Sequence, residues 1–200
     1  MMNIIVVEDQ ALVLGAICSL LSLEVNIQVI GQAQNGEQAL ELLNKTQPDI
    51  ILTDIEMPKM SGLELAQIVQ QTYPQIKVAI MTTFSKSGYI KRALDLGVKA
   101  FILKEAPTDY LVSALIKISQ GGRVIDPELA LMALDDHNPL SDKESKAIKL
   151  ASEGLKTAEI ADKLYLSQGT VRNYLSDAIA KLNAVNRVDA ARIAKQKGWI

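Results

Sequence analysis

Strand-like apolar runs alternate with helix-like amphipathic segments through the first 120 residues of this 200-residue chain. The pattern predicts strands near 3–7, 27–33, 49–54, 76–82 and 99–103, with helices near 10–22, 36–45, 62–72, 86–97 and 107–119. Five such strand–helix units predict an α/β fold, in which a parallel sheet carries helices on both faces. In that architecture a ligand site lies beyond the C-terminal ends of the strands.

Charged side chains stand at that expected edge. Glu8 and Asp9 end the first strand, Asp54 ends the third and is followed by Met57-Pro58, and Lys104 ends the fifth. The ends of parallel strands meet at one edge of a sheet, so these groups should converge there. Three carboxylates and one ammonium at such an edge predict a metal-dependent phosphoryl site.

Mg²⁺ suits this chemistry, because it binds one or two carboxylates together with waters and phosphate oxygens. We expect Asp9 and Asp54 to be carboxylate ligands, with Glu8 acting through water or at the edge of the site. The backbone carbonyl of Glu56, two residues past Asp54, would supply another oxygen.

A carboxylate can accept a phosphoryl group and hold it as an aspartyl phosphate. Asp54 is the expected acceptor, Lys104 would pair with the phosphoryl oxygens, and Thr82 would offer its hydroxyl from the end of the fourth strand. Each residue also has an ordinary alternative: Asp54 as a loop cap, Lys104 as a solvated charge and Thr82 as a β-branched strand residue. Glu8-Asp9 would similarly serve as a helix N-cap pair. Their joint occurrence at the strand ends favours the phosphoryl site.

Gly121-Gly122 should stop the fifth helix, and residues 121–138 are expected to be a linker with a short helix from Pro127 to Leu134. Charge changes sign beyond it. Residues 139–200 carry 11 Lys and Arg against 7 Asp and Glu, whereas the residues before them carry 10 against 16. An acidic front and a mildly basic tail indicate two different tasks.

The tail contains helical patterns but no strand pattern. Ser141 and Glu144 fit a capping box before one helix, and Thr157 opens a second, shorter one. Ser167 then caps a longer helix to about Asn183, and a fourth helix runs from Arg187 to about Lys197. Two helices joined by a short turn, with the second one long, predict a helix-turn-helix motif.

The long helix has two distinct faces. Its apolar residues Val171, Leu175, Ala178 and Leu182 recur at helical spacing. Its polar candidates for reading base edges in the major groove are Arg172, Asn173 and Ser176. Candidates for phosphate contacts are Thr157, Thr170 and Lys181, with Arg187 as an addition. The alternative for each is an ordinary solvated position.

Composition excludes several classes of site and location. The single cysteine, Cys18, cannot form an intrachain disulfide, and with the lone His137 it cannot form a Cys/His metal cluster. No apolar run reaches membrane-spanning length, and Met1 leads into a strand pattern without a basic signal-peptide region. We therefore expect a soluble, cytoplasmic protein that does not bind a membrane.

The first 120 residues resemble the receiver domain of two-component response regulators. The resemblance is carried in order and spacing by Glu8-Asp9, Asp54 with Met57-Pro58, Gly62, Thr82 and Leu103-Lys104. It implies a flavodoxin-like (βα)5 domain over 1–120, Mg²⁺ as cofactor and a sensor histidine kinase as phosphoryl donor to Asp54. It further implies that Thr82 turns inward on phosphorylation and that an aromatic residue, here Phe101, follows. Phe101 lacks the hydroxyl of the tyrosine common at this position, so a switch here would depend on ring burial.

Residues 139–200 resemble the four-helix output domain of the NarL/FixJ (LuxR-type) regulators. The matching positions are Leu140-Ser141, Glu144, Gly154, Glu159-Ile160-Ala161, Leu164, Ser167, Thr170-Val171 and Leu182. This resemblance implies a small all-α domain that binds promoter DNA, and a fourth helix that is similar to a dimerisation surface. Val188, Ala191 and Ile193 of that helix are equally well explained as core residues.

Together the two resemblances imply a non-enzymatic transcription factor that dimerises on phosphorylation, with RNA polymerase as a further partner. Its dimer surface would involve the first and fifth helices or the fourth and fifth. One alternative is a haloacid-dehalogenase-like phosphatase, although such enzymes carry Asp-x-Asp at the nucleophile and this chain has Glu56 at the second acidic position. The other is an orphan regulator whose receiver serves only for dimerisation.

Overall fold

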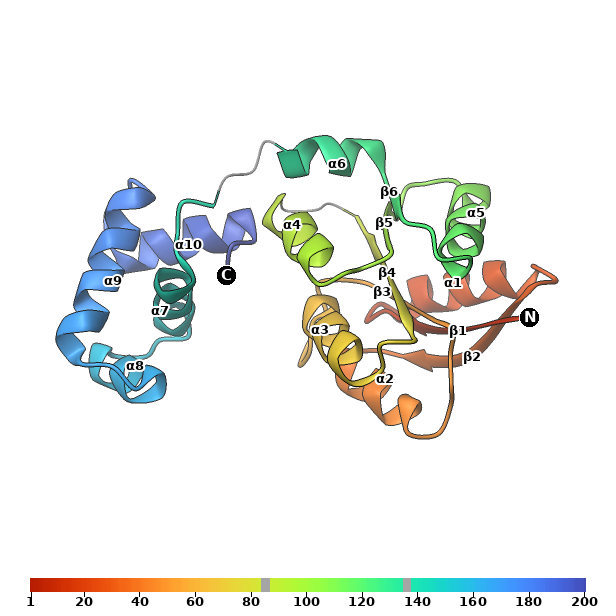
Figure 1. Ribbon diagram of the computed structural model, residues 1–200, viewed down its shortest axis with the longest axis horizontal. Coiled ribbons are helices and arrows are strands. Elements are labelled where there is room, and N and C mark those ends of the chain that lie inside the picture. The colour runs from red at the N-terminus through yellow and green to blue at the C-terminus, as the bar shows by residue number, and fades with distance from the viewer. Residues whose placement is uncertain (84–86, 135–137) are drawn as a thin grey trace. The chain divides into compact units, whose positions relative to one another are not determined.

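The computed structural model describes residues 1–83, 87–134 and 138–200 (Figure 1). The chain divides into two compact units. The first contains Met1–Ser85 and Ile90–Leu134, and the second is made chiefly of Asp135–Ile200. Each unit has its own hydrophobic core and is described separately.

The first unit is built on a parallel sheet, which has six strands within the described residues (Figure 1). Its order is β2-β1-β3-β4-β5-β6. The strands are β1 (Met2–Val7), β2 (Ile27–Ala33), β3 (Ile50–Thr53), β4 (Lys77–Thr82), β5 (Ala100–Leu103) and β6 (Val124–Ile125). The predicted parallel α/β fold is therefore confirmed, and the strands' C-terminal ends lie along one edge.

Helices cover both faces of this sheet. One face packs against α1 (Ala11–Ser22) and α5 (Thr108–Ser119) in a shared core that includes alternate strand residues such as Ile4 and Leu52. The opposite face carries α2 (Gly36–Leu43), α3 (Gly62–Thr72) and α4 (Ser87–Asp95) (Figure 1). Because the central strands are buried on both faces, they read as continuous apolar runs in the sequence.

A short strand lies where the sequence predicted only a linker. Val124 pairs with Ala100, and Ile125 pairs with Phe101, which adds β6 to the edge of the sheet. Two residues are too few to show strand periodicity, so sequence reasoning missed this element. The predicted helix that follows is confirmed as α6 (Pro127–Leu134). Residues 135–137, predicted as a polar break, and residue 86, the predicted start of α4, lie outside the described residues.

The second unit consists of four helices in the predicted order. They are α7 (Asp142–Ser152), α8 (Thr157–Leu164), α9 (Gln168–Lys181) and α10 (Arg187–Lys197). The Ser141 side chain accepts a hydrogen bond from the backbone N–H of Glu144, and Glu144 bonds back to the N–H of Ser141, which completes the predicted capping box. Tyr165 ends α8 in the left-handed conformation, with φ of 55°, and this sharp reversal makes the turn before α9.

Candidate phosphoryl and DNA-binding sites

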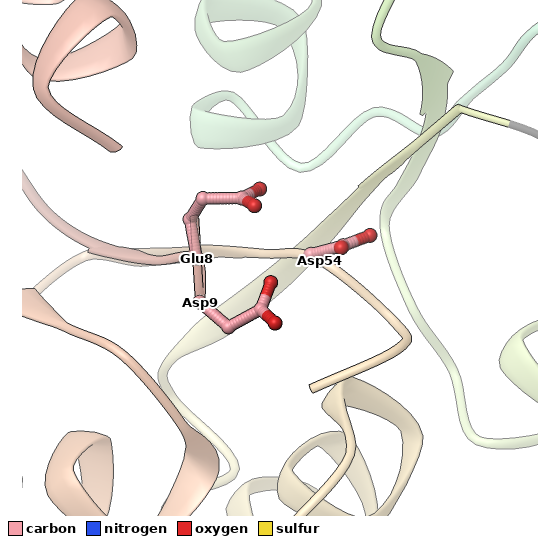
Figure 2. Close-up of side chains that lie close together, drawn as sticks. All are labelled: Glu8, Asp9 and Asp54. Carbon is pink, nitrogen blue, oxygen red and sulfur yellow. The ribbon is translucent and has the colours of Figure 1, made fainter. Parts of the chain in front are cut away.

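Three carboxylates converge beyond the ends of β1 and β3. The backbone N–H of Asp54 donates to Val7 O across 2.9 Å, which aligns the two strand ends. Glu8, Asp9 and Asp54 each place a carboxylate oxygen within 4.8 Å of those of the other two (Figure 2). Glu8 is only 1% exposed and Asp54 only 9%. The predicted acidic cluster is thus assembled in space from two strands that lie some 45 residues apart in sequence.

Lys104 reaches into this cluster from the end of β5. Its Nζ lies 2.6 Å from Glu8 Oε2 and 3.0 Å from Asp54 Oδ2. Its backbone N–H donates to Thr82 O across 2.7 Å, which ties the end of β5 to the end of β4. The structure buries Glu8 in direct contact with the lysine, and its expected action on a metal, through water or from the edge of the site, stays a prediction. The ammonium therefore bridges two carboxylates inside the pocket.

Burial makes the negative charge in this pocket costly. Desolvation raises the pKa of Glu8, and the nearby charge of Asp54 adds to the rise although Lys104 opposes it. Desolvation likewise raises the pKa of Asp54, with Asp9 contributing and Lys104 opposing. Burial works against the charge of Lys104 too, but its short contacts with the carboxylates of Glu8 and Asp54 outweigh this effect and raise the pKa of the lysine. A further positive charge in this pocket would therefore stabilise the ionised carboxylates.

The donor set fits a hard divalent cation. Three ionised carboxylates against one ammonium leave a net charge of minus two. All the ligand atoms are oxygen, which Mg²⁺ prefers. Glu8 Oε2 is buried and makes no hydrogen bond of good geometry within the described residues, despite its ionic contact with Lys104. Glu56 lies in the loop directly after Asp54, where its carbonyl was expected to contribute.

The loop after β3 holds Asp54 through its backbone. Ile55 N–H donates to Asp54 Oδ1 across 2.7 Å, and the buried Thr53 hydroxyl donates to Asp54 O across 2.8 Å. Gly62 closes the loop by donating to Ile55 O across 2.9 Å. A Cβ at Gly62 would overlap the carbonyl oxygen of Asp54. The first turn of α3 can therefore lie this close to the Asp54 backbone only because residue 62 is glycine. Sequence reasoning missed Thr53, which resembled an ordinary β-branched strand residue.

The two expected switch residues lie on one face of the sheet. Thr82 ends β4 and is 4% exposed, and Phe101 on β5 is 1% exposed. Phe101 is in register with Ile80, and Thr82 follows Ile80 by two residues, so all three side chains share a face. The aromatic ring is already buried in this structure.

The α9 helix presents the predicted polar face to solvent. Arg172, Asn173 and Ser176 are exposed, whereas Val171 and Leu175 are buried in the four-helix core. Ser167 caps the helix by accepting the N–H of Thr170 across 3.0 Å, and the two hydroxyls lie 2.9 Å apart. The half-buried Thr157 is the first residue of α8, as predicted.

Comparisons with known proteins identify a family for each of the two units. Residues 4–116 match the response regulator receiver domain, and residues 138–194 match the luxR family of bacterial regulatory proteins. The chain belongs to the NarL/LuxR-type family of response regulators. It is therefore a transcriptional regulator with a receiver domain and a helix-turn-helix DNA-binding domain.

Relatives of this response regulator align over its whole length. The transcriptional regulatory protein YvfU of Bacillus subtilis is 47% identical, covering all of both chains. DesR of the same organism is 41% identical over all of this chain and 99% of its own. A structure of RcsB from Salmonella enterica serovar Typhimurium, bound to the promoter P1flhDC with the phosphomimetic BeF3⁻, is 26% identical with a TM-score of 0.68, covering 98% of each chain. DesR is thus one of the regulator's relatives, and YvfU has the higher identity of the two.

Within the parts of this response regulator that the structure describes, no helix is both long and apolar enough to span a bilayer. The apolar residues of its α10 helix were expected to form either a dimerisation surface or part of the core, and the structure shows both exposed and buried positions among them. Val188 is 71% exposed, whereas Ala191 is 6% exposed and belongs to the core, and Ile193 packs partly against that core. Trp199 also packs against it.

Lys181, whose predicted contact with the DNA backbone stays a prediction, pairs with a carboxylate of its own unit. Its Nζ lies 2.9 and 2.8 Å from the two carboxylate oxygens of Glu144. Glu144 is 5% exposed and already bonded to Ser141, so its buried charge needs a cation. The lysine thus joins α9 to α7 inside the regulator's own four-helix unit, while its side chain stays 42% exposed.

This ion pair predicts a pH-dependent stability. Burial opposes the charge of Glu144, but hydrogen bonds from Lys181 and Ser141 outweigh it and lower the pKa of the carboxyl. A depressed pKa in the folded state stabilises the protein above the unfolded pKa, and this contribution is lost as pH falls through the folded value. We expect Glu144→Gln to lower the free energy of unfolding by about 1–3 kcal/mol at neutral pH, with the difference from wild type closing below about pH 4.

Fluorescence of Trp199, the chain's single tryptophan, reports unfolding of this unit alone. Hydrogen bonds from Arg192 and from the N–H of Val185 also lower the pKa of Asp189. Asp189 is present in both wild type and Glu144→Gln, so its contribution to the pH dependence cancels when their stabilities are compared. Equal loss of stability in wild type and variant between pH 7 and pH 3 would contradict the assignment.

Proposed function

We propose that this response regulator accepts a phosphoryl group on Asp54 from a sensor histidine kinase, dimerises and then binds promoter DNA through α9. The observation that carries the proposal is Lys104 Nζ seated between Glu8 and Asp54 beside the third carboxylate, Asp9. The proposed domains are a receiver over 1–120, a linker over 121–138 and a DNA-binding domain over 139–200. The family matches at 4–116 and 138–194 support these boundaries.

The chain's residues divide the chemistry between them. A carboxylate oxygen of Asp54 attacks the phosphorus, and the bond from phosphorus to the donor nitrogen or oxygen breaks as the leaving group departs with its electron pair. Lys104, 3.0 Å from Asp54, pairs with the incoming phosphoryl oxygens, and the buried Thr82 offers them its hydroxyl. Mg²⁺, held by Asp9, Asp54 and the Glu56 carbonyl with Glu8 beside them, would neutralise charge in the transition state.

Phosphorylation would then bias a two-state receiver. The new charge competes with Glu8 and Asp54 for Lys104 and draws the hydroxyl of Thr82 toward the site. Phe101 shares a sheet face with Thr82, so the packing around the ring would change in response. Because the Phe101 ring is already buried, phosphorylation is not expected to rotate it inward from solvent. We expect instead that the side chains packed around the ring rearrange.

A face of α1 supports dimerisation. The helix contains no charged residue, and its Leu12 and Leu20 are 87% and 41% exposed, with Leu23 just beyond it 79% exposed. A Cβ at Gly15 would meet no atom within 4 Å. An uncharged apolar helix face meets a second copy of itself without like-charge repulsion, and exposed apolar patches mark interaction sites. We propose that this face joins two receivers, with α5 beside it.

Dimerisation would place two α9 helices on DNA half-sites about one helical turn apart. Two weakly binding domains held together gain affinity through effective concentration. Arg172, Asn173 and Ser176 would read base edges, while Thr157 and Thr170 would contact phosphates from helix N-termini. RNA polymerase is a proposed further partner at the promoter.

The proposal is tested by phosphorylating the full-length protein with acetyl phosphate and Mg²⁺. We expect Mg²⁺-dependent labelling, a shift from monomer to dimer in light scattering, and tighter binding to duplexes selected from a random DNA library. Leu12→Glu should keep the labelling and lose the dimer. No labelling, with dimers present throughout, would favour an orphan regulator, and turnover of p-nitrophenyl phosphate would favour a phosphatase.

Arg172 provides a separate prediction. Because arginine pairs bidentately with guanine, Arg172→Ala should cost about 1–3 kcal/mol on the selected duplex and relax the base preference at one position. Competitive binding to duplexes substituted at each position would measure both effects. Arg192, which is paired with Asp189 at 2.8 Å on α10, is the arginine control, and Arg192→Ala should leave the base preference unchanged. A uniform loss on all sequences would instead make Arg172 a phosphate contact.

A further inference from the structure

The strand β6 fastens the chain that leaves α5 to the strand that delivers Lys104 (Figure 1). Val124 N–H donates to Lys99 O, and Asp126 N–H donates to Phe101 O, each across 2.9 Å. β6 is the last strand in the sheet order and has β5 as its neighbour there. The polypeptide that continues into α6 and the linker therefore leaves the sheet from a strand that is hydrogen-bonded to β5.

The two side chains of β6 lie on opposite faces of the sheet. Phe101 is in register with Ile80 on β4 and with Ile125 on β6, so these three side chains form a row on the face that carries Thr82. Phe101 and Ile80 are fully buried, and Ile125 is half-buried at the end of the row. Val124, in contrast, packs on the opposite face against the core shared with α1 and α5.

The same strand is anchored in the acidic pocket. Lys104 directly follows Leu103, the last residue of β5, and its ammonium bridges Glu8 and Asp54. Its backbone N–H is bonded to Thr82 O. A displacement of Lys104 or Thr82 therefore acts on β5 within three residues of Phe101. The carbonyl of Phe101 accepts the N–H of Asp126, and Phe101 is in register with Ile125 on β6.

We propose that β6 passes the state of the phosphoacceptor pocket to the linker, with Ile125 responding to the packing of Phe101. This proposal rests on the proposed function, because it requires that Asp54 be phosphorylated. A two-residue edge strand held by few hydrogen bonds belongs to the low-stability part of a fold, from which moving elements are drawn. Coupling between two sites is a free energy that both share, so weakening the Phe101–Ile125 contact should reduce the effect of phosphorylation on DNA binding.

The chain offers a matched pair of variants for the test. Ile125→Ala truncates the side chain beside Phe101, while Val124→Ala truncates its neighbour on the opposite face, and both keep the backbone N–H groups. We measure the gain in affinity for the selected duplex that acetyl phosphate and Mg²⁺ produce in the full-length protein. Ile125→Ala should reduce this gain about threefold or more and Val124→Ala less than about twofold, with labelling of Asp54 at the wild-type rate in both.

Hydrogen exchange supplies a readout that does not depend on DNA. In wild type, phosphorylation should change the exchange rate of a peptide containing Val124–Asp126, and in Asp54→Ala the phosphodonor should leave that rate unchanged. An undiminished gain in Ile125→Ala, or equal losses in both β6 variants, overturns this proposal alone. Absence of labelling in wild type overturns the proposed function and this proposal with it.

Discussion

Asp54→Ala should abolish phosphorylation and the dimerisation that depends on it. Alanine offers no oxygen to attack phosphorus, and Glu8 cannot replace it because its carboxylate is buried against Lys104 at 2.6 Å. We expect labelling by acetyl phosphate to fall below detection, a loss of at least about 100-fold, since the nucleophile of a covalent transfer is removed outright. Light scattering should show no phosphodonor-dependent increase in mass.

The control for this variant lies at the other end of the same strand. Asp49 accepts the backbone N–H of Asn3 across 2.7 Å, and Asp49→Asn keeps an oxygen for that bond. It should be labelled like the wild type. Burial raises the pKa of Asp54, so its ionised form destabilises the fold at neutral pH, and Asp54→Ala should unfold at the same temperature or a higher one. Unchanged phosphodonor-driven dimerisation in Asp54→Ala would refute the assignment.

Gly62→Ala should damage both the fold and the pocket. The added Cβ would overlap the carbonyl oxygen of Asp54 and come within 3.0 Å of Thr53 Oγ1, so the backbone around the acceptor must move. Forcing an extra methyl group into a packed site costs about 1–3 kcal/mol, which denaturant unfolding followed by circular dichroism would detect. Because the acceptor is displaced, we expect the initial rate of labelling to fall about tenfold or more.

Gly15 is a matched control for this substitution. It also lies in a helix, but a Cβ there would meet no atom within 4 Å. Gly15→Ala should therefore stabilise the protein by about 0.5–1 kcal/mol, as expected for glycine replaced in a helix interior, and leave labelling unchanged. If Gly62→Ala kept the stability and the labelling rate of the wild type, the loop after β3 could accommodate the methyl group without loss of free energy of unfolding. That result would contradict the prediction.

Local periodicity carried much of the architecture. Apolar runs bounded by polar residues located five of the six described strands, because a strand buried on both faces has no polar positions to interrupt it. The same reasoning separated the exposed Arg172 from the buried Val171 on α9. β6 escaped detection because two residues carry no periodicity and pair only once β5 is in place.

The sequence by itself determined the strand-end carboxylates, the order of the elements and the polar face of α9, because each depends on spacing within a short segment. Tertiary structure alone decided the contacts between distant segments. Lys181 meets Glu144 at a sequence separation of 37 residues. The Thr53 hydroxyl bonds the carbonyl oxygen of Asp54, which leaves no room for a Cβ at Gly62, and Glu8 is buried in contact with Lys104. Periodicity specifies which face of an element is buried, whereas the partner buried against it is set only when the elements pack together.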